Sequence, residues 1–192
     1  MKKLVFASNN PNKVKEVAAK LGSQFEVVSL KQAGIEEDIP ETQPDIAGNA
    51  KQKAHFIKDK YGFDCFADDT GLEVKALDGE PGVLSARYAG AERSSDANMD
   101  KVLNGLEQES DRSAQFRTVV CLILNEEEHL FEGIARGSIR KERSGSEGFG
   151  YDPIFEPEGY DITFAEMDME TKNKISHRGK AVGKLVEFLS NQ

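Results

Sequence analysis

Tryptophan is absent from this sequence of 192 residues, which also contains only two cysteines and three histidines. Histidines this scattered and cysteines this far apart give no spacing typical of a zinc site. Cys65 and Cys121 each lie in an apolar, strand-like run, which favours reduced, buried thiols over a disulfide or a nucleophile. The sequence therefore argues against a zinc-based or disulfide-stabilised protein.

Long apolar runs and an excess of basic charge are also lacking. No run approaches the roughly twenty apolar residues that span a bilayer, and the first strand-like residues give way to Ser8, Asn9 and Asn10 without a signal-peptide core. A net charge of -9 argues against non-specific binding to nucleic acid or anionic membrane. We therefore expect a cytoplasmic protein that binds neither, although an anionic ligand could bind at a local basic cluster.

Internal repeats and low-complexity tracts are absent as well. A chain of this length suits one domain with a substantial core, or two small lobes that share a sheet. We expect residues 1–192 to form a single domain.

A polar turn follows the first predicted strand, which covers residues 2–7. In the turn, Ser8-Asn9-Asn10-Pro11-Asn12-Lys13, Asn10 suits the N-cap and Pro11 the first turn of a helix. The free N–H groups and positive dipole end of such a helix, together with Lys13, would stabilise a phosphate. An ordinary capped helix explains the same pattern, because the turn lacks a glycine-rich phosphate loop.

An acidic loop is expected at residues 31–44, and Glu41 lies within it. By itself such a loop is typical of a solvated surface. The apolar residues from Asp45 to about Lys60 keep helical spacing, with Asn49 and Lys53 on a neighbouring stripe. The pattern predicts a helix directly after the acidic loop.

Two adjacent carboxylates, Asp68 and Asp69, follow a short apolar run. Gly71 is expected to turn the chain there, before a second strand-like segment begins. Neighbouring carboxylates repel, so beside an apolar strand they need solvent, a cation or a basic group. A divalent cation such as Mg²⁺ would meet this need. An Asp-rich hairpin turn explains the pair equally well.

The second half of the chain contains a predicted helix at residues 95–106 and two predicted strands at 116–124 and 130–139. Near-continuous apolar character in the first of these strands is typical of burial on both faces. The two strands are expected to pair as a hairpin.

A glycine-rich loop, Gly145–Pro153, carries Phe149 and Tyr151. Its glycines allow close backbone approach, and its aromatic rings suit stacking on a base. A tight turn with both aromatics buried in the core fits the same residues. The sequence also leaves the role of Arg87 and Tyr88 open, since these residues could line a pocket or cover the surface.

Residues 172–180 carry a basic cluster at the expected start of the last helix, for which Ser176 is a plausible N-cap. Cations at the amino terminus of a helix oppose its dipole. The cluster is easier to explain if an anion or a polar ligand binds between it and the helix end.

Together these segments resemble the inosine triphosphate pyrophosphatase family, hydrolases of non-canonical purine nucleoside triphosphates. The resemblance extends from residue 4 to about residue 190, and its motifs occur in the family's order. They are Ser8-Asn9-Asn10-Pro11-Asn12-Lys13, Pro40-Glu41-Thr42, Asn49-Ala50 with Lys53-Ala54, Ala67-Asp68-Asp69-Thr70-Gly71-Leu72, Ser85-Ala86-Arg87-Tyr88, Gly148-Phe149-Gly150-Tyr151-Asp152-Pro153 and Ile175-Ser176-His177-Arg178. Each motif alone is weak, whereas the ordered set is specific. Two departures are Asn9, where the family often has glycine, and Gly48, where bacterial relatives often carry an acidic residue.

The resemblance implies an α/β fold with a long, twisted, mixed β-sheet flanked by helices, two lobes with a central cleft, and a homodimer. It also implies the reaction, in which water attacks the α-phosphate of ITP, dITP or XTP. The products would be the monophosphate and pyrophosphate, with Mg²⁺ as cofactor. Such an enzyme cleanses the nucleotide pool.

In this interpretation Glu41 and Asp69 hold Mg²⁺, and Asp69 is the catalytic base that orients or deprotonates the attacking water. Phe149 stacks on the purine, and Asp152, His177 and Arg178 recognise the edge of the purine base. The lysines and the arginine balance the charge of the triphosphate. The residues predicted to bind substrate are Ser8, Asn9, Asn10, Pro11, Asn12, Lys13, Lys53, Asp68, Thr70, Phe149, Gly150, Tyr151, Asp152, Lys172, His177 and Arg178.

Three other interpretations compete with this one. A related pyrophosphatase for pyrimidine or methylated nucleotides is the nearest, although the motifs at 149–153 and 176–178 argue against it. A nucleotide-sensing module would bind without catalysis, with Asp69 only a metal ligand. A structural protein would leave the basic residues at 13, 53, 172 and 178 without a shared purpose.

Overall fold

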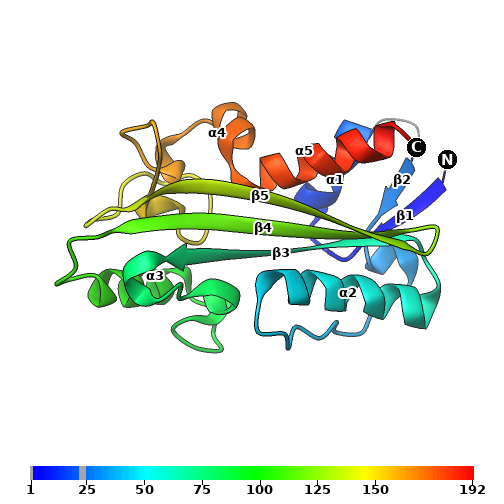
Figure 1. Cartoon of the computed structure of the whole chain (residues 1–192), viewed down its shortest axis with the longest axis horizontal. Helices are drawn as coiled ribbons and strands as arrows, with labels where there is room; N and C mark the ends of the chain where they lie inside the picture. Colours follow the sequence, from blue (N-terminus) through cyan, green and yellow to red (C-terminus); the bar gives the residue numbers. More distant parts are fainter. Residues whose placement is uncertain (1, 22–24) are drawn as a thin grey trace. The chain divides into compact units, whose positions relative to one another are not determined.

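The computed structural model describes residues 2–21 and 25–192 of the chain (Figure 1). The strands are β1 Lys2–Phe6, β2 Phe25–Val28, β3 Cys65–Val74, β4 Ser113–Leu124, β5 Glu127–Ile139 and β6 Phe155–Pro157. The helices are α1 Pro11–Leu21, α2 Ile46–Tyr61, α3 Ser95–Gly105, α4 Met169–Ile175 and α5 His177–Ser190. None of the helices in this described part has the length and apolar character that crossing a membrane requires.

The strands form a mixed sheet of order β2-β1-β3-β4-β5-β6. Strand β1 pairs in parallel with both β2 and β3, and Val5 is in register with Val28 and Cys65. Strand β6 pairs with β5 in the antiparallel sense. Only two residues, Asn125 and Glu126, connect β4 to β5, and such a short connection joins antiparallel neighbours. The predicted α/β fold, a mixed sheet flanked by helices, is confirmed.

The chain divides into two compact units. The first unit contains the described residues up to Asp69, together with Val119–Glu132 and Ala181–Gln192. The second unit contains Thr70–Thr118 and Gly133–Lys180. Strands β3, β4 and β5 each contribute residues to both units.

The core of the first unit is formed by strand residues and two helices. Val17 of α1 and Leu185 of α5 belong to the same buried cluster as Phe66 of β3. Helix α2 lies on the opposite face of the strands (Figure 1), and there the Cys65 thiol donates a hydrogen bond to the Ala54 carbonyl oxygen at 3.2 Å. Apolar residues therefore face helices on both sides of the strands, which explains their near-continuous apolar runs.

The core of the second unit is rich in aromatic rings. The Phe116 ring packs against those of Phe155 and Phe164, with ring centroids 4.7 and 6.0 Å away. Met99 and Val102 of α3 belong to the same buried cluster. Every one of these five side chains is buried.

The helices predicted at 11–21, 45–60 and 95–106 are confirmed as α1, α2 and α3. The turn predicted at Gly71 is wrong, because β3 continues through the two aspartates to Val74. Strand β4 lies beside β3, and the hydroxyls of Thr70 and Thr118 are hydrogen-bonded at 2.7 Å. Pairing with a neighbouring strand keeps the chain extended where the local sequence alone favoured a turn.

The predicted start of the last helix is correct only in part. Ser176 accepts a hydrogen bond from the Gly179 N–H at 3.1 Å, as an N-cap does. Lys172, however, lies in the last turn of a separate helix, α4, which begins after the N-cap Asp168. A cation there interacts favourably with the helix dipole rather than opposing it. Gly179 permits the sharp change of direction, since a Cβ atom at this position would lie 1.8 Å from the Asn173 carbonyl oxygen.

Candidate active site

The turn between β1 and α1 is held by its own side chains. The Asn10 side-chain oxygen accepts a hydrogen bond from the Lys13 N–H at 3.4 Å, so Asn10 is the predicted N-cap. The Ser8 hydroxyl accepts a hydrogen bond from the Asn10 N–H at 3.1 Å. The Asn9 side chain accepts one from the Lys31 N–H at 2.9 Å and so ties this turn to the segment after β2. Asn9 therefore has a structural role where the resembled family often has glycine.

Lys13 extends from this turn to β3. Its Nζ lies 3.2 Å from Oδ2 of Asp68, a carboxylate that is buried. Pro11 is the first residue of α1, as predicted. The side chain of Asn12, also predicted to bind substrate, lies outside the described part of the structure.

Lys53 is the centre of a second polar cluster in the same unit. Its side chain is buried on α2, and its Nζ lies 2.6 Å from Glu41 Oε1 and 3.4 Å from Asp69 Oδ1. Asp69 Oδ2 is also buried and has no hydrogen-bond partner among the described residues. One ammonium group thus faces two carboxylates, and a lone acceptor oxygen is left over.

The pKa values of this cluster are shifted by burial and by charge. Burial raises the pKa of Asp69, the Glu41 carboxylate raises it further, and Lys53 and Asn49 oppose the shift. Burial by itself would lower the pKa of Lys53, but the Asp69 and Glu41 carboxylates outweigh it and raise that pKa. Lys53 therefore stays protonated near neutral pH, while Asp69 is a stronger base than an ordinary aspartate.

The same cluster fits a hard divalent cation. Mg²⁺ typically binds through one or two carboxylates and keeps several waters. Glu41 and the buried Oδ2 of Asp69, which has no hydrogen-bond partner among the described residues, offer such a set. Residues 2–21 and 25–192 contain no group of three or more His, Cys, Asp and Glu side chains placed to hold a metal. The chemistry of the donors thus suits a partly hydrated Mg²⁺ better than a metal enclosed by protein ligands.

In the second unit, the glycine-rich loop folds around Asp152. This carboxylate is 4% exposed, and its Oδ2 accepts hydrogen bonds from the Phe149 N–H at 2.8 Å and from Lys172 Nζ at 2.6 Å. Gly148 has a φ of 78°, and a Cβ atom there would lie 2.1 Å from Asp152 Oδ2. The glycine is required by this close approach of the backbone to the carboxylate.

The two aromatic residues of this loop have different environments. Phe149 is 70% exposed, and Lys172 Nζ lies 5.3 Å from the centroid of its ring. Tyr151 is buried, and its hydroxyl donates a hydrogen bond to the Ser85 carbonyl oxygen at 2.7 Å. Phe149 is therefore available to stack on a base, whereas Tyr151 belongs to the core of the unit. Gly150, between them, has a φ of 64°.

Other residues of the second unit that the sequence singled out lie close to its core. His177 begins α5 and stacks on Phe116, with ring centroids 4.6 Å apart and an angle of 18° between the rings. Arg178 follows it on the same helix and is half-buried. Tyr88 packs against the core cluster, with the Lys101 ammonium 4.0 Å from its ring centroid. Tyr88 thus covers the core.

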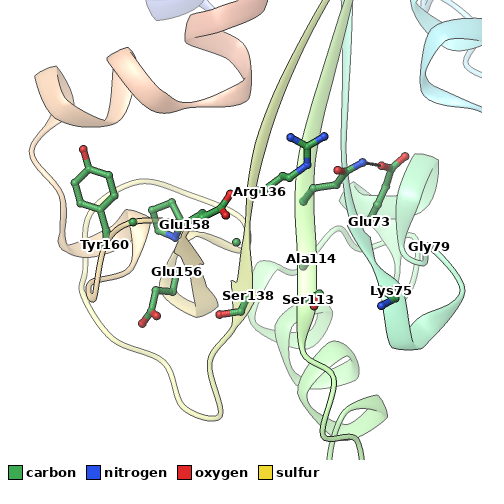
Figure 2. A pocket seen from close by; sticks show the side chains of 14 residues that line it. Glu73, Lys75, Gly79, Ser113, Ala114, Arg136, Ser138, Glu156, Glu158 and Tyr160 are labelled. Carbon is green, nitrogen blue, oxygen red and sulfur yellow. Dashed lines mark hydrogen bonds between the residues drawn. The ribbon is translucent and has the colours of Figure 1, made fainter.

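A cavity of about 560 Å³ also lies in the second unit (Figure 2). Among the described residues, none of the predicted site residues lines it. Three of its charged side chains have protein partners: Glu73 accepts a hydrogen bond from Gln115 at 2.7 Å, Lys75 lies 2.9 Å from Asp111, and Glu156 pairs with Arg140 at 2.6 Å. The cavity therefore adds nothing to the predicted site.

Two polar residues of α2 next to Lys53 were not predicted to belong to the site. Asn49 accepts a hydrogen bond from the Gln43 N–H at 2.9 Å, and Gln52 accepts one from the Thr42 N–H at 2.8 Å. Asn49 precedes Gln52 by three residues and Lys53 by four, and this helical spacing was the available signal in the sequence. The sequence did not reveal that they contact the backbone beside Glu41.

The fold and these clusters define an α/β protein with paired carboxylates and lysines in one unit and an exposed aromatic ring beside a lysine in the other, features typical of nucleotide-handling enzymes. The model of the Ham1 family matches residues 4–188, and the chain belongs to this family. The dITP/XTP pyrophosphatase of Flavobacterium psychrophilum is 55% identical over 188 residues, covering 98% of this chain and 99% of the relative. The family resemblance of the sequence motifs is thereby confirmed.

Solved structures agree with this assignment. The Ham1 protein of Staphylococcus aureus superposes with a TM-score of 0.94 at 38% identity, covering 99% of each chain. A HAM1 protein from Coxiella burnetii superposes with a TM-score of 0.95 at 37% identity, covering 100% of each chain.

Proposed function

We propose that this protein hydrolyses the non-canonical purine nucleoside triphosphates ITP, dITP and XTP to the monophosphate and pyrophosphate. The observation that carries the proposal is the cluster in which Glu41 and Asp69 share the buried Lys53. Asp69 there keeps a buried oxygen without a hydrogen-bond partner in the described chain. The substrate class is supported by the name of the 55% identical relative, a dITP/XTP pyrophosphatase.

Asp69 is the catalytic base in this mechanism. Its Oδ2 accepts a proton from the attacking water, whose oxygen forms a bond to the α-phosphorus. The bond from that phosphorus to the bridging oxygen of pyrophosphate breaks, and the nucleoside monophosphate and pyrophosphate leave. A pKa raised by burial suits Asp69 to this role, because a general base is most effective when its pKa approaches the working pH.

Glu41 and Asp69 would hold Mg²⁺. When bound, this ion would neutralise phosphate charge and lower the pKa of a water ligand. Lys53 keeps the two carboxylates close together without cancelling their combined negative charge. Asp68 supports the pair by holding Lys13 at the end of the β1–α1 turn.

The triphosphate would be bound by the β1–α1 turn and by cationic side chains. The amino terminus of α1 provides a positive dipole end, and Ser8 and Asn10 provide polar groups beside it. Lys13, Lys53, Lys172 and Arg178 add positive charge, and Thr70 adds a hydroxyl.

The purine would stack on the exposed ring of Phe149. His177 and Arg178 would donate hydrogen bonds to the 6-keto oxygen of hypoxanthine or xanthine, a position where adenine carries an amino donor. A buried donor left unpaired by adenine costs about 1 kcal/mol or more. Asp152 contributes by holding the Phe149 backbone and Lys172 in place.

We also propose that residues 1–192 act as one catalytic domain of two lobes, within a homodimer in the cytoplasm. The buried free thiols of Cys65 and Cys121 agree with a reducing compartment. The homodimer rests on the family resemblance and is tested by measuring the mass of the protein in solution.

A pyrophosphate-release screen tests the proposed function. The purified protein is assayed with ITP, dITP, XTP, ATP, GTP, dTTP and UTP in the presence of Mg²⁺, with a chelator control. Fast release from the first three substrates is expected. Faster release from dTTP or UTP would indicate a pyrimidine nucleotide pyrophosphatase, and nucleotide binding without any release would indicate a sensing module.

A further inference from the structure

The segment that carries Glu41 forms neither helix nor strand. Between Gly34 and Asp45 the described backbone is irregular, so no regular hydrogen-bond ladder holds Glu41 in place. A carboxylate on such a segment has to be ordered before it can bind a cation tightly, and this ordering opposes binding. The backbone beside Glu41 must therefore be held by contacts from elsewhere.

Helix α2 supplies these contacts to the two residues that follow Glu41. The Thr42 N–H donates to Gln52 Oε1 at 2.8 Å, and Gln52 Nε2 donates to the Thr42 hydroxyl at 2.8 Å. The Gln43 N–H donates to Asn49 Oδ1 at 2.9 Å. Two consecutive backbone amides are thus bound to side chains of one helix.

The same face of α2 also holds the Glu41 side chain. Asn49, Gln52 and Lys53 are related by three and four residues, so they project from one side of the helix. Lys53 donates to Glu41 Oε1 at 2.6 Å. Asn49 and Lys53 are buried, so the contacts that these two side chains make are partly shielded from water, whereas those of Gln52 are exposed.

Gly48 allows the segment to approach the helix this closely. A Cβ atom at this position would lie 2.8 Å from the Gln43 Cβ, and one of the two would have to move. The absent side chain at residue 48 and the hydrogen bonds from Asn49 and Gln52 therefore act on the same short stretch of backbone.

We infer that Gln52 and Asn49 are positioning residues that hold Glu41 beside Lys53 and Asp69 before a cation binds. The inference rests on the proposed function, in which Glu41 holds Mg²⁺. Neither residue is a metal ligand in it. They act through the backbone of Thr42 and Gln43.

The test compares Gln52→Leu with a conservative variant and a matched control. Gln52→Leu removes both hydrogen bonds to Thr42 at similar side-chain size, whereas Gln52→Glu keeps an oxygen that accepts from the Thr42 N–H and hydroxyl. Lys51→Leu is the control on the adjacent residue, because Lys51 Nζ pairs with Glu128 at 2.8 Å and not with the Glu41 segment.

Two measurements are made on each protein without nucleotide. Hydrogen–deuterium exchange reports the protection of the Thr42 and Gln43 amides, and electron paramagnetic resonance gives the dissociation constant for Mn²⁺ as the probe cation. For Gln52→Leu we expect faster exchange at both amides and a dissociation constant raised about tenfold, as the loss of one or two hydrogen bonds implies. Gln52→Glu and Lys51→Leu are expected to stay within about threefold of the wild-type protein. The turnover of Gln52→Leu should recover at saturating Mg²⁺.

An unchanged Mn²⁺ dissociation constant in a folded Gln52→Leu protein would overturn the inference. If that variant does not fold, Gln52→Ala takes its place, since it removes the same two hydrogen bonds to Thr42 without adding a large apolar side chain. An unchanged constant in Gln52→Ala has the same meaning. A wild-type protein that binds Mn²⁺ but releases no pyrophosphate would instead count against the proposed function.

Discussion

Each unit of this protein contains a buried lysine, and the two lysines have different surroundings. In the first unit Lys53 contacts the carboxylates of Glu41 and Asp69 at 2.6 and 3.4 Å. In the second unit Lys172 contacts Asp152 at 2.6 Å. Asp152 also accepts a hydrogen bond from the Phe149 N–H, whereas Asp69 Oδ2 lacks a hydrogen-bond partner within residues 2–21 and 25–192.

The difference shows how one type of ion pair serves two purposes. Around Lys53 the carboxylates outnumber the ammonium group, so negative charge and an acceptor oxygen are left for a cation. Around Lys172 the charges balance, and Nζ lies 5.3 and 5.5 Å from the ring centroids of Phe149 and Phe164. The cluster around Lys53 suits metal chemistry, and the pair of Lys172 with Asp152 supports an aromatic surface.

The largest expected effect comes from removing Asp69, the proposed base in the cluster around Lys53. Asp69→Asn should lower pyrophosphate release from ITP by at least about a hundredfold. The melting temperature should not fall, because the pKa of Asp69 is raised and its ionised form therefore opposes folding near neutral pH. Turnover assays and thermal unfolding measure the two effects. Near-normal turnover would remove Asp69 from its assigned role.

The next prediction compares the two buried lysines, Lys53 and Lys172, directly. Lys53→Met and Lys172→Met each leave buried carboxylate charge without its partner, which destabilises a protein by about 3 kcal/mol. Mg²⁺ should restore more stability to Lys53→Met than it adds to the wild-type protein, since it can replace the lost charge between Glu41 and Asp69. It should add no such extra stability to Lys172→Met. Denaturant unfolding with and without Mg²⁺ measures this, and equal gains in both variants would mean that the clusters do not differ as described.

A smaller effect separates the two aromatic residues of the glycine-rich loop. Phe149→Ala should raise the KM for ITP about tenfold, because stacking on a base contributes about 1–3 kcal/mol, and stability should hardly change since the ring is exposed. Tyr151→Phe is the matched control, and it should lower stability by about 1 kcal/mol through the lost hydrogen bond to Ser85. Its KM should stay the same. A raised KM in Tyr151→Phe alone would reverse the two assignments.

The smallest effect concerns a surface ion pair, in contrast to the buried ones. Hydrogen bonds from Lys51 and His55 lower the pKa of Glu128 in the folded protein. Its contribution to stability is therefore present above the pKa of an unfolded glutamate and is lost as the pH falls through the lower folded value. Glu128→Gln should reduce the free energy of unfolding at pH 7 by less than about 1 kcal/mol. The difference in unfolding free energy between the two proteins should vanish in acid. A difference that grows on acidification would show that folding does not lower the pKa of Glu128.

Local signals predicted much of the secondary structure. Asn10 and Pro11 marked the start of α1, and apolar residues at helical spacing marked α2 and α3. Helix α4 and strand β6 were not predicted, because elements of seven and three residues are too short to show a clear periodicity. The turn predicted at Gly71 was wrong, because pairing with β4 keeps β3 extended there.

The candidate site was predictable to a similar degree. Ordered motifs indicated Glu41, Lys53 and Asp69, and the structure brings these three into contact. The loop residues by themselves left both Phe149 and Tyr151 open between stacking and burial, and only the family resemblance assigned Phe149 to the purine. Their exposure depends on the packing of a whole loop around Asp152, which neighbouring residues in the sequence do not reveal.

The sequence by itself determined the family, the helices with clear caps and periodicity, and the residue types available for chemistry. Those properties depend on local backbone preference and on motif order, and both follow directly from the order of the residues. Only the tertiary structure decided that Asp69 Oδ2 is buried without a hydrogen-bond partner in the described chain, while Asp152 Oδ2 accepts two hydrogen bonds. It also decided that α2 holds the backbone beside Glu41. Such features depend on distances between residues far apart in the chain, and these distances exist only once the strands and helices have packed.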